Sequence, residues 1–434
     1  MSSIAAVAPM SLDVGQEEED ALYRKVIFRI VPLFFLGFII SYLDRVNISY
    51  AKLQMATDFG LTDATFALGA SVFFWGYMLF EIPSNLVLQR FGARMWIARI
   101  MITWGIVSMC MVFSSNSTVF YSLRFLLGVC EAGFVPGVMY YTNCWLPSKR
   151  QSGMYSLFLM ALPVSIVFGA PISGAILDLM QGVGGLKGWH WLFLLEGIPS
   201  LILGFVIIAF LRNKPADVKW LTEREKKIIE SNVTVEAGHK LSGIGDMLKC
   251  GRIYLLIITM IMFNTGFYGL TFWMPTLFKN AGITSSLQNG LCTAIPFGIA
   301  AISMRLNARH SEKTGEQRLH GTISVLLGAI GLFLATYFHE NFAFSLAMLS
   351  VAAAGILSLM PIYWTLPGRI LSGSAAAAGL ALINSCGSLS GIMGSLIIGF
   401  AGMQVGMYTL AALLLGCAIM FYIICPPRVN EIKE

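Results

Sequence analysis

The stretch VIFRIVPLFFLGFIISYLDRVNISY, residues 26–50, decides how this chain folds. It is apolar over most of its length and long enough to cross a hydrocarbon core about 30 Å thick as an α-helix. Near its end it nevertheless carries Asp44 and Arg45. A charge within a membrane costs roughly 2.5–3.5 kcal/mol on insertion scales, so such residues usually face one another or a wet cavity. They commonly mark the path of an ion or a substrate.

The composition extends this interpretation to the whole chain. Of 434 residues, 56% are hydrophobic and only 12% are charged, and the mean hydropathy is +0.74. These values are too apolar for a soluble globular protein. The apolar runs are continuous rather than alternating, which excludes a β-barrel.

We therefore expect an all-α integral membrane protein with about twelve transmembrane helices. The apolar runs place them at 26–50, 64–88, 95–113, 118–146, 152–178, 190–211, 253–279, 287–306, 319–338, 342–366, 374–400 and 404–424.

A long polar segment divides these runs into two groups of six. The expected organisation is an N-terminal tail (1–25), an N-terminal six-helix bundle (26–211), a linker (212–252), a C-terminal six-helix bundle (253–424) and a C-terminal tail (425–434). The linker has a short helical pattern around residues 221–229.

Lysine and arginine predict the orientation, because they are retained on the cytoplasmic side during insertion. Roughly 24 of the 29 fall in segments on the side of the N-terminus. The opposite loops hold Lys52, Lys187 and Lys279. Both tails are therefore expected in the cytoplasm, and the net charge of +6 reflects this bias rather than nucleic-acid binding.

Other functional classes lack their signatures. The eight cysteines form no CxxC pair and the histidines are scattered, which favours structural roles over a metal site. We find no cleavable signal peptide, no GKS or GKT triplet for an ATP-driven pump, no carbonyl filter of a channel and no nucleophile elbow of an enzyme. We expect no cofactor apart from the proton as coupling ion.

A weak internal sequence repeat lies in the loop that follows the second helix of each half. NLVLQRFGAR (residues 85–94) and ARHSEKTGEQR (residues 308–318) both carry a glycine flanked by charged residues. Such a loop could be only a topology signal, but its recurrence favours a cytoplasmic gate. The candidate gate residues are Arg90, Gly92, Arg94, Glu312, Gly315 and Arg318.

These loops resemble those of the major facilitator superfamily, whose two six-helix bundles surround a cavity that opens alternately to each side. Glu312 stands where an Asp is usual, and Gln89 occupies the acidic position of the first loop, where Asn85 also replaces a glycine. Arg124 followed by spaced glycines resembles the superfamily's fourth helix. GAPISG (residues 169–174) resembles a motif associated with antiporters, although it also lets two helices pack or bend.

Narrower motifs are similar to the anion:cation symporter family. They are YLDRVNIS (42–49), GVCEAGFVPG (128–137), WLPSKR (145–150) and GWHWLFLLEGIPS (188–200). The resemblance spans essentially the whole chain, and residues 131–200 are most similar to bacterial 4-hydroxyphenylacetate, phthalate and tartrate permeases.

Four intramembrane charges are the main site candidates. Arg124 and Glu131 are seven residues apart and share a helix face, whereas Asp44 and Arg45 are adjacent and must find different partners. Burial raises the proton affinity of a carboxyl and a nearby guanidinium lowers it. Occupancy of the site by substrate can therefore change whether the carboxyl is protonated. The resemblance implies that Asp44 and Glu131 carry protons. We expect Arg124 to set the affinity of Glu131 and Arg45 to grip a substrate carboxylate.

Alternatively, all four charges form a buried ion-pair lattice that fixes helix packing. Further substrate-binding candidates are polar or aromatic residues at suitable depths, namely Tyr42, Tyr77, Asn264, Tyr268, Trp364, Thr365 and Asn384. Glu81 and Glu196 resemble partners of cytoplasmic-side cations.

The expected function is proton-coupled uptake of a small organic anion, with an aromatic carboxylate first and a hydroxy-dicarboxylate or sugar acid such as tartrate as the alternative. An anion exchanger or exporter stays open. The expected location is a bacterial inner membrane, and the resemblance implies a functional monomer.

Overall fold

The structure, a computed structural model, describes residues 15–237, 251–367 and 374–426. Within these ranges, 12 helices are long and apolar enough to cross a membrane. A helix satisfies its own backbone hydrogen bonds, which is the condition for lying in hydrocarbon. The predicted all-α fold with about twelve spans is confirmed.

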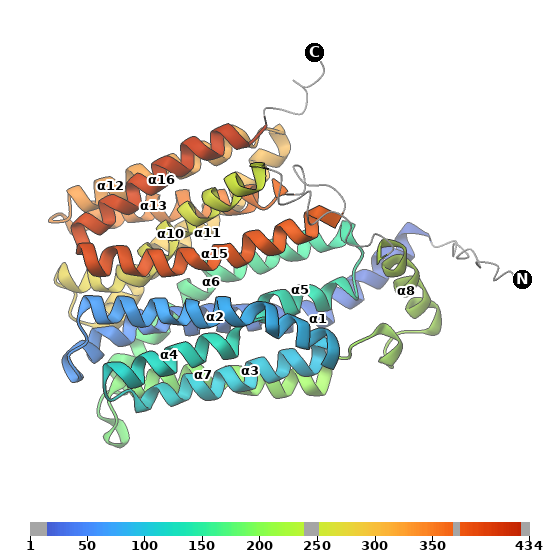
Figure 1. Cartoon of the computed structure of the whole chain (residues 1–434), viewed down its shortest axis with the longest axis horizontal. Coiled ribbons are helices and arrows are strands. Elements are labelled where there is room, and N and C mark those ends of the chain that lie inside the picture. Colours follow the sequence, from blue (N-terminus) through green and yellow to red (C-terminus); the bar gives the residue numbers. More distant parts are fainter. Residues whose placement is uncertain (1–14, 238–250, 368–373, 427–434) are drawn as a thin grey trace, which may run out of the picture.

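The helices lie in two groups that follow the chain order (Figure 1). The first six spans are α1 (Gln16–Asp58), α2 (Asp63–Phe91), α3 (Ala93–Cys110), the pair α4 (Ser117–Glu131) and α5 (Phe134–Asn143), α6 (Ser148–Leu179) and α7 (Gly188–Phe210). The last six are α10 (Gly251–Asn280), α11 (Ser286–Thr314), α12 (Arg318–Tyr337), α13 (Phe342–Tyr363), α15 (Ser374–Ala401) and α16 (Met403–Ile424). Single 3-10 turns occur at Met111–Phe113, Val183–Gly185 and Pro215–Asp217.

An even number of spans puts the start of α1 and the end of α16 at the same end of the molecule, here named the terminal end. The opposite end, which holds the turn between α1 and α2, is named the far end. In Figure 1 the terminal end lies on the right and the far end on the left.

The two groups meet mainly along two helix pairs, α6 with α11 and α2 with α15. Small residues make these contacts close. A side chain at Gly174 or Gly290 would collide with backbone atoms of the opposite group, and one at Gly399 would collide with Ala67. Glycine and alanine allow membrane helices to approach in this way. Within this structure the GAPISG motif therefore serves inter-helix packing.

The helix α1 begins well before the predicted span. It starts at Gln16, and Leu22 and Tyr23 are already buried. Residues 16–25 of the predicted N-terminal tail are therefore helical, and most of their side chains are exposed; residues 1–14 lie outside the described ranges.

The linker helix α8 (Glu223–Ala237) packs on this early part of α1. Lys25 Nζ lies 3.0 Å from Glu225 Oε1, and Arg224 pairs with Glu18 at 3.0 Å. Partial burial raises the pKa of Glu225, but the Thr222 backbone N–H and the Lys25 ammonium outweigh it and hold the pKa below its usual value. The ionised carboxylate therefore stabilises the docked position of α8.

Candidate functional site

The middle of α1 sends two adjacent charges to different neighbours. Asp44 is 1% exposed and bonds to α3 and α7, whereas Arg45 is 7% exposed and contacts α4. Successive residues of an α-helix are about 100° apart around its axis, so their side chains diverge. The prediction that the two residues need different partners is confirmed.

Arg45 and Glu131 form a buried ion pair. Arg45 Nε donates to Glu131 Oε1 at 2.7 Å, and Nη2 lies 2.6 Å from the same oxygen. Ser41 Oγ also donates to that oxygen at 2.7 Å. Glu131 Oε2 is buried and accepts no hydrogen bond from any residue that the structure describes. The described donors therefore gather on one carboxylate oxygen, and the other oxygen is left without one.

The helix breaks immediately after Glu131. The helix α4 ends there, Gly133 has a φ of +90°, and α5 begins at Phe134. This left-handed conformation suits glycine, and a Cβ at Gly133 would collide with Ser84 of α2. The predicted fourth span thus consists of two helices. Interrupted helices within membranes commonly lie at substrate and ion sites.

Asp44 accepts four hydrogen bonds and forms no ion pair within the described ranges. Its Oδ2 accepts from Trp104 Nε1 at 2.5 Å and from Ser200 Oγ at 3.1 Å. Its Oδ1 accepts from Ser108 Oγ at 3.1 Å and from Asn47 Nδ2 at 3.3 Å. Neutral donors from three helices thus hold this carboxyl inside the first group.

Arg124 is fully buried at 0% exposure. Its Nε donates to the Gly69 carbonyl at 3.3 Å, and its guanidinium lies 4.9 Å from the Phe73 ring centroid. Nη1 and Nη2 have no hydrogen-bond partner in the part of the chain described. Arg45 of α1, rather than Arg124, pairs with Glu131, but Arg124 is close enough to interact electrostatically with that carboxylate, so its expected influence on Glu131 stays a prediction.

Aromatic rings surround the Arg45 guanidinium. Its Cζ lies 5.4, 5.6 and 4.9 Å from the ring centroids of Tyr42, Phe73 and Tyr77. Tyr268 of α10 is close enough to interact with Arg45 electrostatically. The structure therefore brings the predicted residues Tyr42, Tyr77 and Tyr268 together at the junction of the two groups.

Asn384 finds its partner across this junction. Its Nδ2 donates to Glu81 Oε1 at 3.0 Å, and Ser385 Oγ donates to Glu81 Oε2 at 3.1 Å. The prediction that Glu81 pairs with a cytoplasmic-side cation is therefore wrong. Glu81 is 3% exposed, and it joins α2 to α15 through two neutral donors.

Glu196 also lacks the predicted cation. It is 3% exposed, and its Oε1 accepts from Ser173 Oγ at 2.6 Å. No ion pair with Glu196 occurs among the residues described. The prediction failed because α6 and α1, rather than a loop, cover this face of α7.

The remaining candidates of the second group lie on α10 and at the end of α13. Asn264 is buried on α10. Trp364 and Thr365 follow the last residue of α13, at the terminal end, and Thr365 Oγ1 donates to Gln317 at 3.0 Å. Trp364 and Thr365 were expected to line the central site, and this position corrects that expectation.

The predicted gate loops form equivalent contacts in the two groups. Arg94 Nε donates to the Ile208 carbonyl near the end of α7 at 3.0 Å. Arg318 Nε donates to the Tyr422 carbonyl near the end of α16 at 2.7 Å. An arginine at a helix C-terminus satisfies carbonyls that lack an intrahelical donor.

Both glycines of these loops have positive φ, +86° at Gly92 and +66° at Gly315. Arg90 and Glu312 are exposed. The sequence repeat thus corresponds to the same contact in each group, an arginine that donates to a carbonyl near a helix C-terminus, here named the clamp.

This repeated architecture matches a known family. Residues 34–395 match the model of the Major Facilitator Superfamily. The chain belongs to the major facilitator superfamily. It is accordingly a membrane transporter and not an enzyme.

Relatives and solved structures agree with this assignment. A putative tartrate transporter of Agrobacterium vitis is 43% identical and covers 95% of this chain and 93% of its own length. The putative metabolite transport protein NicT of Pseudomonas putida is 39% identical over 87% of each chain. The crystal structure of a D-xylose-proton symporter has a TM-score of 0.73 at 16% identity, covering 92% of this chain and 98% of that chain, and supports the fold alone.

In this transporter the two groups are bonded to each other at the far end. Lys52 of α1 is 4% exposed, and its Nζ lies 3.2 Å from Thr276 Oγ1 and 4.0 Å from the Trp273 ring centroid of α10. Lys279 Nζ donates to the Leu53 carbonyl at 2.7 Å. Lys52, expected in a loop, therefore belongs to the closed contact between the groups.

Over residues 15–237, 251–367 and 374–426, no group of three or more His, Cys, Asp or Glu residues is placed to hold an ion. The chemistry of the site is that of carboxyl, guanidinium, hydroxyl and aromatic groups.

Proposed function

We propose that this transporter couples the uptake of a small organic anion to the entry of a proton, and that Glu131 is the coupling group. The observation that carries this proposal is the one-sided pair of Arg45 and Glu131. Among the described residues, every donor to this carboxylate binds Oε1, and Oε2 accepts no hydrogen bond.

Charge balance explains how this pair couples the two fluxes. Protonation of Glu131 leaves the Arg45 guanidinium as an unpaired buried charge, a state that costs about 3–5 kcal/mol. An anion that binds Arg45 removes this cost. The carrier with both proton and anion, and the carrier with neither, are therefore favoured over the half-loaded forms by about two to three and a half orders of magnitude.

The arrangement of arginines favours a substrate with two carboxylates. Arg45 and Arg124 both lie against Phe73, at 5.6 and 4.9 Å from its centroid. Arg124 has two buried terminal nitrogens without a partner in the described part. A dicarboxylate would bind both guanidinium groups, and guanidinium groups suit bidentate carboxylate recognition. The putative tartrate transporters among the relatives agree with a hydroxy-dicarboxylate.

An aromatic carboxylate is the second candidate. The rings of Tyr42, Tyr77 and Tyr268 gather around Arg45 and could stack with an aromatic substrate. Asn384 and Asn264 remain proposed hydrogen-bonding residues from the second group.

We further propose that the terminal end faces the cytoplasm of a bacterial cell and the far end faces outward. The excess of Lys and Arg in the loops of the terminal end supports this orientation. The inter-group bonds at the far end then correspond to a state that is closed to the outside. The cytoplasmic gate would close when the two groups move together at the terminal end, and it would contain Arg90, Arg94, Glu312 and Arg318.

Uptake into proteoliposomes tests this function. Labelled tartrate and labelled phthalate are offered separately, with and without an imposed inward proton gradient. We expect accumulation of tartrate that disappears when a protonophore collapses the gradient, and weaker accumulation of phthalate. Transport that reaches the same final level with the gradient collapsed would overturn the coupling.

A further inference from the structure

Glu196 is a buried acid that the Arg45–Glu131 pair does not explain. It lies on α7, two to three turns from the far end, and is 3% exposed. Ser173 Oγ donates to its Oε1 at 2.6 Å, but its Oε2 is buried without a hydrogen-bond partner in the described structure. Retaining an unpaired carboxylate there is costly unless it can take up a proton.

Four polar residues, here named the polar stripe, are distributed along α1 between the far end and the level of this acid. Asp44, Asn47, Gln54 and Asp58 are spaced so that they lie on one face of α1, and each of them contacts α7. This stripe is regular enough to be found in the sequence by its helical spacing.

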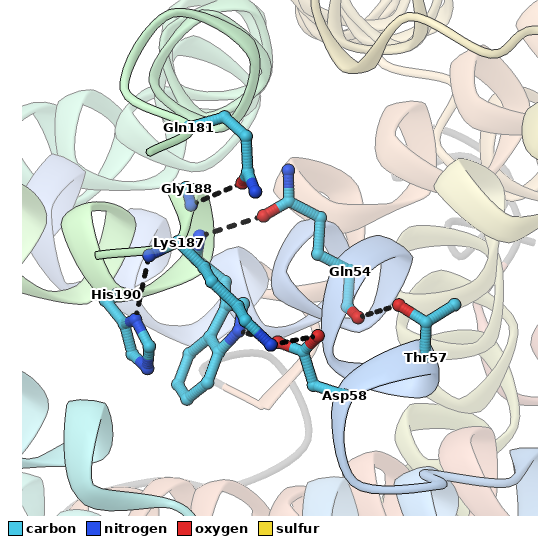
Figure 2. Close-up of polar contacts among 8 residues, drawn as sticks. Gln54, Thr57, Asp58, Gln181, Lys187, Gly188 and His190 are labelled. Atoms are coloured by element: carbon cyan, nitrogen blue, oxygen red, sulfur yellow. Dashed lines mark hydrogen bonds and ion pairs between the residues drawn. The ribbon is translucent and has the colours of Figure 1, made fainter. Parts of the chain in front are cut away.

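Figure 2 shows the outer end of the stripe. Asp58 Oδ1 lies 2.6 Å from Lys187 Nζ, and its Oδ2 accepts from Trp189 Nε1 at 2.5 Å. Gln54 Oε1 accepts from the backbone N–H of Trp189 at 3.1 Å. Because Lys187 is exposed, this end of the stripe is reached by water.

Asn47 links the two acids at the inner end. Its Nδ2 donates to Asp44 Oδ1 at 3.3 Å, and its side chain also contacts Glu196. Asn47 Oδ1 and Glu196 Oε2 are both buried acceptors without a donor in the described structure. A proton on Glu196 Oε2 would supply a donor where both of these acceptors lack one.

Neither acid forms an ion pair with a residue that the structure describes, although the buried Arg124 guanidinium interacts electrostatically with Asp44. The titratable groups that face Glu196 are Asp44 and Tyr50 of α1. The helix α6 contributes the uncharged Ser173, and α3 contributes Gly105 and Met109 against the neighbouring Gly197. Ser200, one turn along α7 from Glu196, donates to Asp44 at 3.1 Å. Asp44 and Glu196 interact electrostatically, and like charges that interact favour a state in which one of the two carboxyls is protonated.

We propose that Glu196 is a relay residue that passes protons between the far end and Asp44. Its O–H bond breaks as an O–H bond forms on Asp44, and the Glu196 carboxylate then takes the next proton from water at the far end. Asn47 and Ser200 position the two carboxyls. This inference rests on the proposed proton coupling and adds to it the pathway of the proton between the far end and Asp44.

The test compares Glu196→Gln with wild type in proteoliposomes by two measurements. Proton-driven accumulation of tartrate should fall to the equilibrium ratio, whereas counterflow of labelled against unlabelled tartrate should persist, because exchange needs no net proton movement. Glu196→Asp should restore part of the accumulation with a shifted pH profile. Ser173→Ala, which leaves both acids in place, should shift the pH profile of accumulation without abolishing it.

Two results would overturn the relay. One is accumulation by Glu196→Gln with the wild-type level and pH profile. The other is loss of both accumulation and counterflow in the Gln and Asp variants alike, which would make Glu196 a packing residue. Failure of the proposed coupling is recognised separately, because wild-type accumulation itself would then be independent of the proton gradient.

Discussion

Asp178 at the end of α6 offers a quantitative test of the closed far end. Its carboxylate accepts hydrogen bonds from Ser285 Oγ at 2.8 Å and from the backbone N–H groups of Ser286 and Leu287 at 3.1 and 2.9 Å. It therefore caps the N-terminus of α11 in the opposite group. Removing such a cap costs about 0.5–2 kcal/mol, and the exposure of Asp178 favours the lower part of this range, about 1 kcal/mol.

Asp178→Ala should thus shift the balance from the closed toward the open far end by about fivefold. Spin labels at the exposed positions Val183 and Thr284, in a chain whose native cysteines have been replaced, report the separation of the groups by pulsed electron resonance. Asp58→Ala is the matched control, because Asp58 bonds Lys187 and Trp189 within its own group. An unchanged distance distribution in Asp178→Ala, or an equal shift in the control, would refute the reasoning.

Three further predictions concern stability and docking. Gly128→Val should lower the melting temperature in detergent, because the valine side chain would collide with the α2 backbone at Phe73 and overpacking costs about 1–3 kcal/mol. An unchanged melting temperature would contradict this close packing. Arg318→Ala should raise the rate of amide exchange in the last turn of α16, because the Tyr422 carbonyl loses its donor and the helix end loses about 0.5 kcal/mol of stabilisation. An unaltered exchange rate would show that this contact does not stabilise the helix end. Docking of α8 holds the pKa of Glu225 below its ordinary value. The ionised carboxylate therefore stabilises the docked helix at pH values above the ordinary pKa of Glu, and this stabilisation is lost as the pH falls through the lowered pKa. Glu225→Gln should therefore weaken the docking of α8 at neutral pH. The measurement is faster amide exchange of residues 223–237, corrected for intrinsic rates, and exchange at the wild-type rate would contradict this role of Glu225.

The sequence was sufficient for the fold because each span is a long apolar run whose backbone bonds are local. It also predicted that Asp44 and Arg45 diverge, since adjacent positions on a helix cannot share a partner. Both statements depend only on helix geometry and on the cost of charge in lipid.

The pairing of charges depended on tertiary contacts that helical spacing does not encode. Arg124 shares a helix with Glu131, yet Arg45 from α1 takes the place beside that carboxylate. Glu81 and Glu196 were assigned to cations that are near in the loops, whereas neutral donors on other helices hold them.

The break at Gly133 carried a partial signal. A glycine followed closely by Pro136 interrupts the fourth apolar run, and both residues disfavour a continuous helix. Spaced glycines in membrane helices also mark close packing, as at Gly128 against α2. Only the structure distinguishes a break from a packing contact.

Proton movement triggered by substrate tests the central claim most directly. Tartrate is added to lightly buffered wild-type proteoliposomes, with the membrane potential clamped, and the pH of the medium is recorded. We expect the medium to become more alkaline as tartrate enters, and we expect Glu131→Gln to abolish this change while tartrate counterflow continues. Tartrate entry without any change of pH, or an unchanged pH signal in Glu131→Gln, would rule out proton coupling through Glu131.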